Sequence, residues 1–341
     1  MTLILTIEST CDETSAAVIT DQREVLGSIV ASQEKLHDLF RGVVPEVAAR
    51  QHVQAILPVI HLTLQRAGIG MQDLDAVAVA HTPGLAGSLL VGLSAAKAIS
   101  LAQGIPLIGI NHLHAHVYAC RLAAQQDVFP CVGFIVSGGH SNFYECSDAL
   151  TFRYLGGTID DAAGEAFDKV AAMLGLGFPG GPAISRVALE GDRRAFDYPR
   201  PFANDTQQLK FSFSGLKTAV RYSLFGNGQP LQDPATLGKQ KIADVAASFE
   251  QAVVDCLIAK CNHALDQTGR DTLCVGGGVA ANRVFREQLQ QAMEQRGATL
   301  WIAPPQLCTD NAVMGAIAVE KYQAGLFEEL DLDIAAGLER S

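Results

Sequence analysis

The sequence predicts an α/β protein that contains two copies of one strand-rich unit, and three observations lead to this prediction. The segment 130–148 (PCVGFIVSGGHSNFYECSD) repeats the pattern at the start of the chain, a buried strand, a polar turn and a second strand. The segment 271–282 (DTLCVGGGVAAN) repeats 75–87 (DAVAVAHTPGLAG), a buried strand that ends in glycines before a helix. The first segment and its repeat are 128 residues apart (3 to 131), whereas the second segment and its repeat are 196 residues apart (75 to 271). The difference implies that the second copy contains about 68 additional residues.

The elements of the first copy follow from hydrophobic spacing and from glycines that stop helices. In chain order we predict strands at 2–8 and 14–21 around a polar turn at 9–14, two helices within 32–68 of which the second ends at Gly68, a buried strand at 75–84, a helix at 87–104 that ends at Gly104, and a strand at 106–112.

These repeats predict two α/β domains, 1–129 and 130–341. The second domain carries the inserted segment at about 150–240, and a C-terminal helix at about 311–325 packs back on the first domain. Two such copies facing each other would place both glycine turns in one cleft between the domains, which is a common position for a ligand.

Composition excludes several classes of protein. With 48% hydrophobic and 18% charged residues in a chain of 341, the protein is expected to be globular. A formal net charge of −11 argues against a solitary nucleic-acid binder, so a polynucleotide partner would need a local basic patch or a second protein. The eight cysteines show no CxxC spacing and predict free thiols in a reducing compartment.

The sequence predicts a cytoplasmic protein with no membrane association. The N-terminal apolar run meets Glu8 before any cleavage-site pattern, which indicates a buried strand rather than a signal peptide. The weakly polar stretch 82–96 ends at Lys97 and is expected to be too short to span a bilayer.

The stretch INHLHAHVYA (110–119) contains the candidate metal ligands His112 and His116. Histidines four apart share one face of a helix, whereas His114 points elsewhere. The zinc-protease motif HExxH requires a glutamate in the second position, and Leu113 stands there. A third ligand is needed, and Asp310 in PPQLCTDNAVMG (304–315) is a candidate, with a helix cap as the alternative role.

Two glycine turns are candidate nucleotide sites. In IVSGGHS (135–141) a strand runs into Ser-Gly-Gly, where backbone N–H groups can approach an anionic oxygen, although a plain hairpin turn is the alternative. In VGGGVAAN (275–282) three glycines follow a strand, and Asn282 can hydrogen-bond a nucleoside. The chain lacks GxxxxGK[ST], so it is not a P-loop protein.

The inserted segment has an acidic and a basic cluster. The acidic group comprises Asp160, Asp161, Glu165 and Asp168, of which the last three are expected on one helical face. A solvated helix start and a ribose or cation site are equally open alternatives for it. The basic residues Lys210, Lys217 and Arg221 are expected to be ordinary surface charges, with contacts to RNA phosphates as the alternative.

Glycine turns at the ends of two repeated units, without a P-loop, resemble the actin/hexokinase/Hsp70 (ASKHA, ribonuclease H-like) nucleotide-binding architecture. Within it, one set of motifs resembles the TsaD family of bacterial tRNA N6-adenosine threonylcarbamoyltransferases over nearly the whole chain, to about residue 325. The motifs occur in the order IESTCDET, GVVPEVAARQH, HxxxH, VSGGHS, IDDAAGEAFDKVAAMLGLGFPGGP, FSFSGLKT, GGGVAAN and CTDNAVMG.

The resemblance implies transfer of a threonylcarbamoyl group from threonylcarbamoyl-AMP to N6 of adenosine 37, in tRNAs that read codons beginning with A. It also implies one divalent metal, Fe²⁺ with Zn²⁺ as the rival, and work with TsaB-like and TsaE-like proteins. It implies metal ligation by His112, His116 and Asp310, active-site roles for Asp12 and Glu13, and adenylate binding by Ile135, Val136, Ser137, Gly138, Gly139, Asp168, Gly181 and Asn282.

Three other functions compete with this one: an ASKHA-type ATPase or sugar kinase, a metalloprotease, and a scaffold within a complex. The chain also departs from the family in three places. IEST stands where IETS is usual, His114 stands between the two candidate ligands, and the tail DIAAGLERS (333–341) lacks the expected Arg-Pro-Arg-Trp-like ending.

Overall fold

The computed structural model describes residues 1–40, 42–227, 229 and 233–337, and the chain in it divides into two compact units. The first unit comprises Met1–Phe129, Ser147–Phe152 and the chain from Gln306 onward. Its elements in chain order are β1 (Leu3–Glu8), β2 (Glu13–Thr20), β3 (Val25–Ser32), α1 (Glu34–Asp38), α2 (Pro45–Ala67), η1 (Met71–Asp73), β4 (Ala76–Thr82), α3 (Ala86–Gln103), β5 (Leu107–Asn111), α4 (His112–Ala124), α10 (Pro305–Cys308), η4 (Ala312–Ala316) and α11 (Ile317–Gln323).

The second unit comprises Pro130–Cys146 and Arg153–Pro305. Its elements in chain order are β6 (Cys131–Val136), β7 (Ser141–Cys146), β8 (Phe152–Gly157), α5 (Ala163–Leu174), α6 (Gly180–Ala188), α7 (Ser214–Phe225), η2 (Pro234–Thr236), α8 (Lys239–Thr268), β9 (Thr272–Gly276), η3 (Gly278–Ala281), α9 (Arg283–Arg296) and β10 (Thr299–Ile302).

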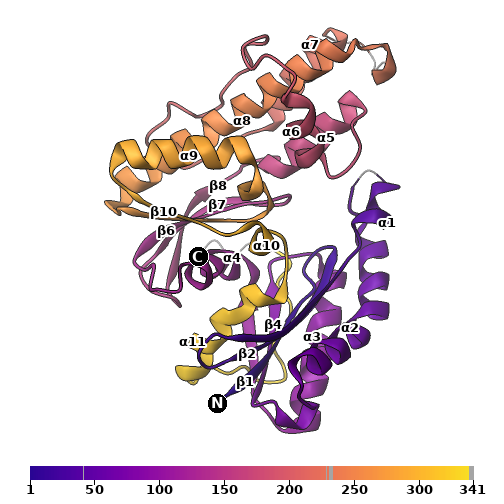
Figure 1. Ribbon diagram of the computed structural model, residues 1–341, viewed down its shortest axis with the longest axis vertical. Helices are drawn as coiled ribbons and strands as arrows, with labels where there is room; N and C mark the ends of the chain where they lie inside the picture. The colour runs from indigo at the N-terminus through magenta and orange to yellow at the C-terminus, as the bar shows by residue number, and fades with distance from the viewer. Residues whose placement is uncertain (41, 228, 230–232, 338–341) are drawn as a thin grey trace. The chain divides into compact units, whose positions relative to one another are not determined.

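The described residues form two five-stranded sheets with one topology (Figure 1). Their strand orders are β3-β2-β1-β4-β5 and β8-β7-β6-β9-β10. In each sheet the first two strands are antiparallel, and the first strand also pairs in parallel with the strand that follows the helices. The predicted duplication of an α/β unit is therefore confirmed in the order and direction of the strands.

In the first unit, helices cover both faces of the sheet. Helices α2 and α3 pack on one face, where leucine, isoleucine and valine side chains of β1, β2 and β4 form the core. The segments η4 and α11 contact β1 and β5 on the other side. The predicted helix ends are confirmed, since α2 and α3 stop at Gly68 and Gly104 with φ of 71° and 67°, a left-handed conformation that glycine adopts without strain.

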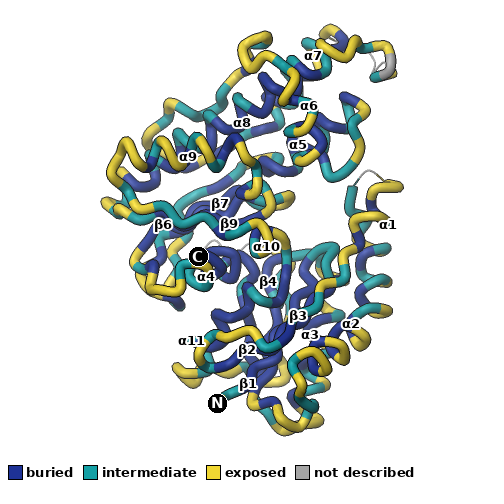
Figure 2. Tube along the Cα trace, in the orientation of Figure 1, coloured by how far each residue is buried: buried dark blue, intermediate teal, exposed yellow. Residues whose placement is uncertain are grey.

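In the second unit, three helices follow the third strand before the long helix α8. These are α5, α6 and α7, and the first unit has only the short α1 at the corresponding place among its described residues. Helix α8 packs on β6 and β9, and α9 packs on α8 and β10. Figure 2 shows the strands of each sheet as mostly buried and the outer faces of the helices as exposed.

The sequence prediction missed the third strand of each sheet, β3 and β8. Both lie at sheet edges and are only partly buried, so their side chains do not alternate cleanly between apolar and polar. All eight cysteines are thiols outside disulfides, as predicted, and Cys11 alone among them is partly exposed.

Helix α3 runs six residues past Lys97 to Gln103, which corrects the expectation that this stretch is too short for a membrane span. Its 18 residues have a mean hydropathy of 1.2, enough by length and composition to cross a membrane. A single such helix is weak support for insertion, because core helices of soluble proteins meet the same criterion, and α3 packs on α2 and β4.

The C-terminal segment belongs to the first unit. Leu332 and Ile334 pack against its core, and the N–H of Ala335 donates to the carbonyl of His81 at 3.1 Å. The last residues of the atypical tail, 338–341, lie outside the described residues.

Candidate functional site

His112 and His116 lie in the first two turns of α4, immediately after β5. The helix begins here because the side-chain oxygen of Asn111 caps it, accepting the N–H groups of Leu113 and His114 at 2.9 and 3.3 Å. The ring centroids of His112 and His116 are 4.7 Å apart, and both side chains are almost completely buried.

Asp310 completes a three-residue group with these histidines, although it is 194 residues distant from His116 in sequence. Its Oδ1 lies 3.2 Å from His116 Nε2 and 3.5 Å from His112 Nε2. The three candidate ligand atoms lie within 4.8 Å of one another. All three residues belong to the first unit.

Two buried hydrogen bonds fasten the segment after Asp310 to the sheet. The N–H of Ala312 donates to Ser15 Oγ at 3.0 Å, and the carbonyl of Ala312 accepts from Thr6 Oγ1 at 2.7 Å. The side-chain oxygen of Asn311 caps η4, so Asn311 takes the capping role that was the alternative for Asp310. Strands β1 and β2 thus determine where Asp310 lies.

The spacing of this group fits a divalent metal ion. Metal bonds of about 2.0–2.2 Å in a tetrahedral arrangement place two ligand atoms about 3.3 Å apart, close to the 3.2 and 3.5 Å found here. The side chain of Asp310 is 19% exposed, against 5% and 0% for the two histidines, so the site is open on the Asp310 side. Three protein ligands with one open side are typical of catalytic rather than structural metal sites.

The electrostatics around the group also fit a cation. Burial lowers the pKa of His112, but the carboxylates of Asp310 and Glu8 outweigh burial and raise this pKa to about 9. Burial lowers the pKa of His116. Burial, then Asp310 and Asp12, raise the pKa of Glu13 to about 10. Carboxyl groups that lie close together are harder to ionise, and a nearby cation would make their ionisation easier.

Asp12 and Glu13 lie in and directly after the turn between β1 and β2, where the sequence predicted them. The turn is held by backbone contacts, with the carbonyl of Asp12 accepting from Gln33 N at 3.0 Å. The carboxyl group of Glu13 accepts from Ser32 Oγ at 3.4 Å. After burial, the charges of Asp12, Asp310 and Glu13 all raise the pKa of the Cys11 thiol, so these three carboxyl groups lie close together. The first unit thus brings the five predicted residues, these three and the two histidines, into one region.

His114 lies apart from this group, as its helical spacing predicts. Its ring stacks on Phe152 with centroids 4.0 Å apart and an angle of 6° between the ring planes. Burial, followed by the nearby charge of Lys321, lowers the pKa of His114 to about 4.

The predicted adenylate residues 135–139 form the end of β6 and the turn before β7 in the second unit. Ile135 and Val136 are buried, whereas a Cβ atom added to Gly138 or Gly139 would meet nothing within 4 Å. The start of α5 is fastened to this turn, since Gly164 N donates to the carbonyl of Ser137 at 3.1 Å. The turn therefore presents open backbone on a fixed support.

Asp168 and Gly181 lie at the junction of α5 and α6. The Oδ1 atom of Asp168 accepts the N–H of Gly180 at 2.7 Å and so holds the first turn of α6. A Cβ on Gly180 would lie 2.5 Å from the carbonyl oxygen of Phe167, whereas one on Gly181 would meet open space. Gly181 thus has open space beside its backbone, next to a tightly packed glycine.

Asn282 caps α9 and belongs to a partly buried polar cluster. Its Oδ1 accepts from Phe285 N at 2.9 Å, and its Nδ2 donates to Ser185 Oγ and Glu250 Oε1 at 3.0 and 2.8 Å. Both N–H groups of the amide are therefore occupied within the protein. Sequence reasoning missed Ser185 and Glu250, because neither stands in a glycine turn.

The acidic cluster 160–168 differs from the prediction. Helix α5 begins at Ala163, whose N–H donates to Ser141 Oγ, so Asp161 precedes the helix and does not share its face. Asp161 pairs with Lys169 and Lys217 at 2.8 and 2.6 Å. Asp160 accepts the N–H groups at the start of α7. These two carboxylates have structural roles, and Lys217 is paired with an acid.

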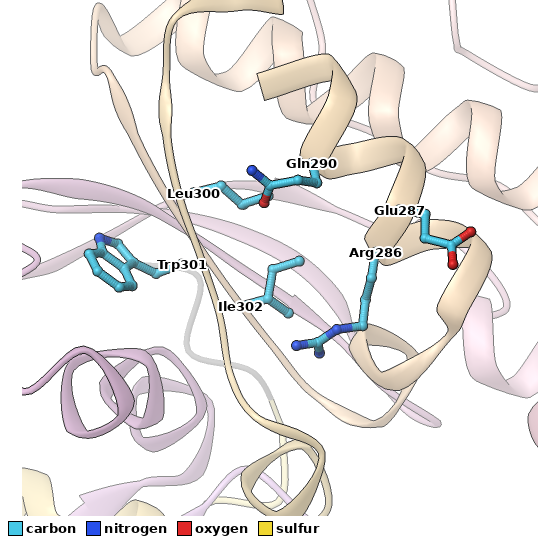
Figure 3. A pocket seen from close by; sticks show the side chains of 6 residues that line it. All are labelled: Arg286, Glu287, Gln290, Leu300, Trp301 and Ile302. Carbon is cyan, nitrogen blue, oxygen red and sulfur yellow. The ribbon is translucent and has the colours of Figure 1, made fainter. Parts of the chain in front are cut away.

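An open pocket of about 440 Å³ lies in the second unit, outside the predicted site residues (Figure 3). It is lined by Arg286, Glu287, Gln290, Leu300, Trp301 and Ile302. The guanidinium group of Arg286 donates to the carbonyls of Ala280 and Ala303, which commits it to holding the loop around η3.

Comparison with known proteins gives one consistent result. The family model described as TsaD, tRNA N6-adenosine threonylcarbamoyltransferase, matches residues 24–317. A protein of Rhodopirellula baltica with this name is 55% identical over 99% of the chain and 97% of its own length. One from Symbiobacterium thermophilum is 48% identical over 98% of the chain and 96% of its own length.

Solved structures show the same fold at low sequence identity. Full-length HypF in a phosphate- and nucleotide-bound form matches 96% of the chain and 47% of its own, with a TM-score of 0.63 and 14% identity. Component A of (R)-2-hydroxyglutaryl-CoA dehydratase from Acidaminococcus fermentans matches 95% of the chain and all of its own, with a TM-score of 0.53 and 12% identity.

Proposed function

The chain belongs to the TsaD family of tRNA N6-adenosine threonylcarbamoyltransferases, and on this basis we propose how its residues carry out the transfer. It is an acyltransferase that forms N6-threonylcarbamoyladenosine in tRNA and has the ASKHA fold. The donor is threonylcarbamoyl-AMP, and the acceptor is N6 of adenosine 37 in tRNAs that read codons beginning with A.

One divalent metal is held by His112, His116 and Asp310. The observation that supports this most is the convergence of both Nε2 atoms on a single Asp310 oxygen at the open side of the group. Two histidines and one carboxylate are a donor set typical of non-haem Fe²⁺, which favours iron over zinc. When bound, the metal supplies a Lewis acid for the carbonyl of the activated carbamoyl group.

The adenylate part of the donor binds in the second unit. Backbone N–H groups of the turn Ser137–Gly139 take the phosphate, because this turn has open space where side chains would otherwise stand. Asp168, Gly181 and Asn282, with the strand end at Ile135 and Val136, take the nucleoside. Because Asn282 uses both amide N–H groups and its backbone N–H internally, it contacts the ligand through its side-chain oxygen, which also accepts from Phe285 N.

The mixed anhydride is already activated, so the chain needs no nucleophile of its own. Its residues orient the carbonyl group against the adenine amine, and orientation alone lowers barriers by several kcal/mol in general. Asp12 and Glu13 stand beside the metal group as active-site carboxyl groups. AMP is the leaving group, and its phosphate stays at the Ser137–Gly139 turn.

The acceptor adenosine must be exposed in a single-stranded loop, because N6 of a paired and stacked base is not accessible. The net charge of −11 supports dependence on partners for tRNA binding, and we propose TsaB-like and TsaE-like proteins for this role. The pairing of Lys217 with Asp161 argues against that lysine as a phosphate contact. We place the protein in the cytoplasm, where the tRNA is, without membrane association.

An exposed apolar face on α2 and α3 supports a docking site for the TsaB-like partner. Val53 and Leu57 on α2 are 64% and 70% exposed, and Leu90 on α3 is 47% exposed. The two helices meet at Ala49 and Gly87, one turn before Val53 and Leu90. Figure 2 shows exposed stretches along α2. An exposed apolar patch of this kind marks an interaction surface.

Leu57→Asp is expected to weaken binding of the TsaB-like partner at least about tenfold, because a carboxylate would be buried without a counter-charge. Isothermal titration of the purified proteins measures this. Leu189→Asp is the matched control, since Leu189 is 67% exposed in the second unit. Equal weakening by both variants would exclude this face as the docking site.

The activity is tested with purified chain, threonylcarbamoyl-AMP, unmodified tRNA and the TsaB-like partner, with modified adenosine measured by mass spectrometry. Chelator-treated protein is expected to lose most of the modification, and Fe²⁺ or Zn²⁺ to restore it. Undiminished yield after chelation would exclude the metal. Adenosine triphosphate hydrolysis without tRNA modification would favour the ASKHA-type ATPase, and casein cleavage the protease.

A further inference from the structure

Glu8 is a buried carboxylate directly behind the candidate metal group. It is the last residue of β1 and is 3% exposed. Its Oε2 accepts a hydrogen bond from His112 Nδ1 at 3.1 Å, and its Oε1 accepts the N–H of Thr10 at 2.8 Å. Both oxygens are thus occupied, so the carboxylate has a fixed orientation.

This contact determines which nitrogen of His112 carries the proton. A carboxylate can only accept, so a hydrogen shared with Glu8 sits on His112 Nδ1. The hydroxyl oxygen of Thr10, 3.3 Å from the same nitrogen, can accept from that hydrogen as well. The lone pair of the neutral ring is then on Nε2, the atom that lies 3.5 Å from Asp310 Oδ1. Histidine ligands of metals are generally fixed in this way by a carboxylate or a carbonyl group.

We propose that Glu8 is a positioning residue that makes His112 the principal metal ligand. It holds the ring with Nε2 toward the ion and makes that nitrogen a stronger donor. The inference rests on the proposed metal site, to which it adds a residue that is not itself a ligand. Glu8 stands outside the group of atoms within 4.8 Å of one another.

His116 provides the contrast that makes His112 the principal ligand. Its Nδ1 atom is buried and has no hydrogen-bond partner among the described residues. Only Nε2 of this ring is engaged, with Asp310 at 3.2 Å. Of the two histidines, therefore, His112 has a carboxylate at Nδ1 that fixes its orientation away from the proposed ion, whereas the contact of His116 is with the proposed ligand Asp310 itself.

The test compares Zn²⁺ affinity of metal-free full-length variants in competition with a chromophoric chelator. Glu8→Ala is expected to bind Zn²⁺ about 10–100-fold more weakly than the unchanged chain. Glu8→Gln keeps an acceptor oxygen for Nδ1–H and is expected to recover part of this loss. Ser9→Ala is the matched control, because Ser9 is equally buried in the same turn but bonds the carbonyl of Ser88.

A second measurement separates positioning from general damage to the fold. In the zinc-loaded chain, nitrogen chemical shifts of the His112 ring are expected to show the proton on Nδ1, and Glu8→Ala is expected to remove this hydrogen-bonded proton signal. Folding of each variant is checked by its thermal midpoint.

The outcomes distinguish failure of the proposed metal site from failure of the proposed role of Glu8. An unchanged chain that binds no Zn²⁺ would overturn the metal site and this inference together. Zn²⁺ binding that is as tight in Glu8→Ala as in the unchanged chain would overturn only the role of Glu8. Equal losses in Glu8→Ala and Ser9→Ala would show that the turn as a whole, not the carboxylate, supports the site, and would also overturn it.

Discussion

Asp310→Ala is expected to lower tRNA modification by roughly 100-fold or more. The variant removes the only carboxylate among the three proposed ligands and leaves His112 and His116 without their shared contact. Loss of a Lewis acid removes several kcal/mol of transition-state stabilisation, and about 2.7 kcal/mol corresponds to 100-fold in rate. Initial rates with threonylcarbamoyl-AMP and saturating tRNA measure this, together with the metal content of the purified variant. His112→Ala is expected to have an effect of similar size.

The matched control is His114→Phe, which removes a histidine from the same helix but keeps an aromatic ring to stack on Phe152. We expect its activity and metal content to stay close to those of the unchanged chain. Near-normal activity of Asp310→Ala, or an equal loss in His114→Phe, would contradict the assignment of the three ligands.

Gly277→Ala is expected to have the largest effect on stability, with a loss of roughly 3 kcal/mol in the free energy of unfolding of the second unit. Gly277 has φ of 97° and ψ of 161°, a region that is essentially restricted to glycine and costs other residues about 1–3 kcal/mol. An added Cβ would also lie 2.5 Å from the carbonyl oxygen of Val136, so strands β6 and β9 would have to separate. The midpoint of denaturant unfolding, followed by the fluorescence of Trp301, measures the loss.

Gly278→Ala is the control for this substitution. Gly278 is the next residue, its φ is not positive, and an added Cβ would meet nothing within 4 Å. We expect its unfolding midpoint to change little. If both variants unfold at the same denaturant concentration as the unchanged chain, the close approach of Gly277 to β6 is wrong.

Local signals predicted the elements whose ends are set by single residues. Gly68 and Gly104 stop α2 and α3 as expected, because the left-handed conformation at a helix end is a property of glycine itself. By comparison, the predicted start of α5 was wrong, because Asp161 was expected to lie on the helix and instead precedes it. That start depends on the hydroxyl group of Ser141, which is 22 residues distant in sequence.

The site residues likewise divide into those that local sequence predicts and those that depend on residues distant in sequence. The spacing of His112 and His116 predicts a shared face directly, whereas Asp310 required the repeat and the family resemblance to be considered at all. Glu8 lies in the IESTCDET motif, yet nothing in the neighbouring sequence distinguishes it from a buried strand residue. Its partner His112 is 104 residues distant in sequence, and only the pairing of β1 with β4 and of β4 with β5 brings the two together.

The fastening of Asp310 to β1 and β2 has a consequence for biosynthesis. During translation, the ribosome adds Asp310 to the chain 194 residues after His116. The first unit therefore stays without this proposed ligand until all of the second unit has been translated. Premature termination before this aspartate would yield products that lack one of the three proposed ligands, so under the proposed assignment acquisition of the metal would report that synthesis has passed that point.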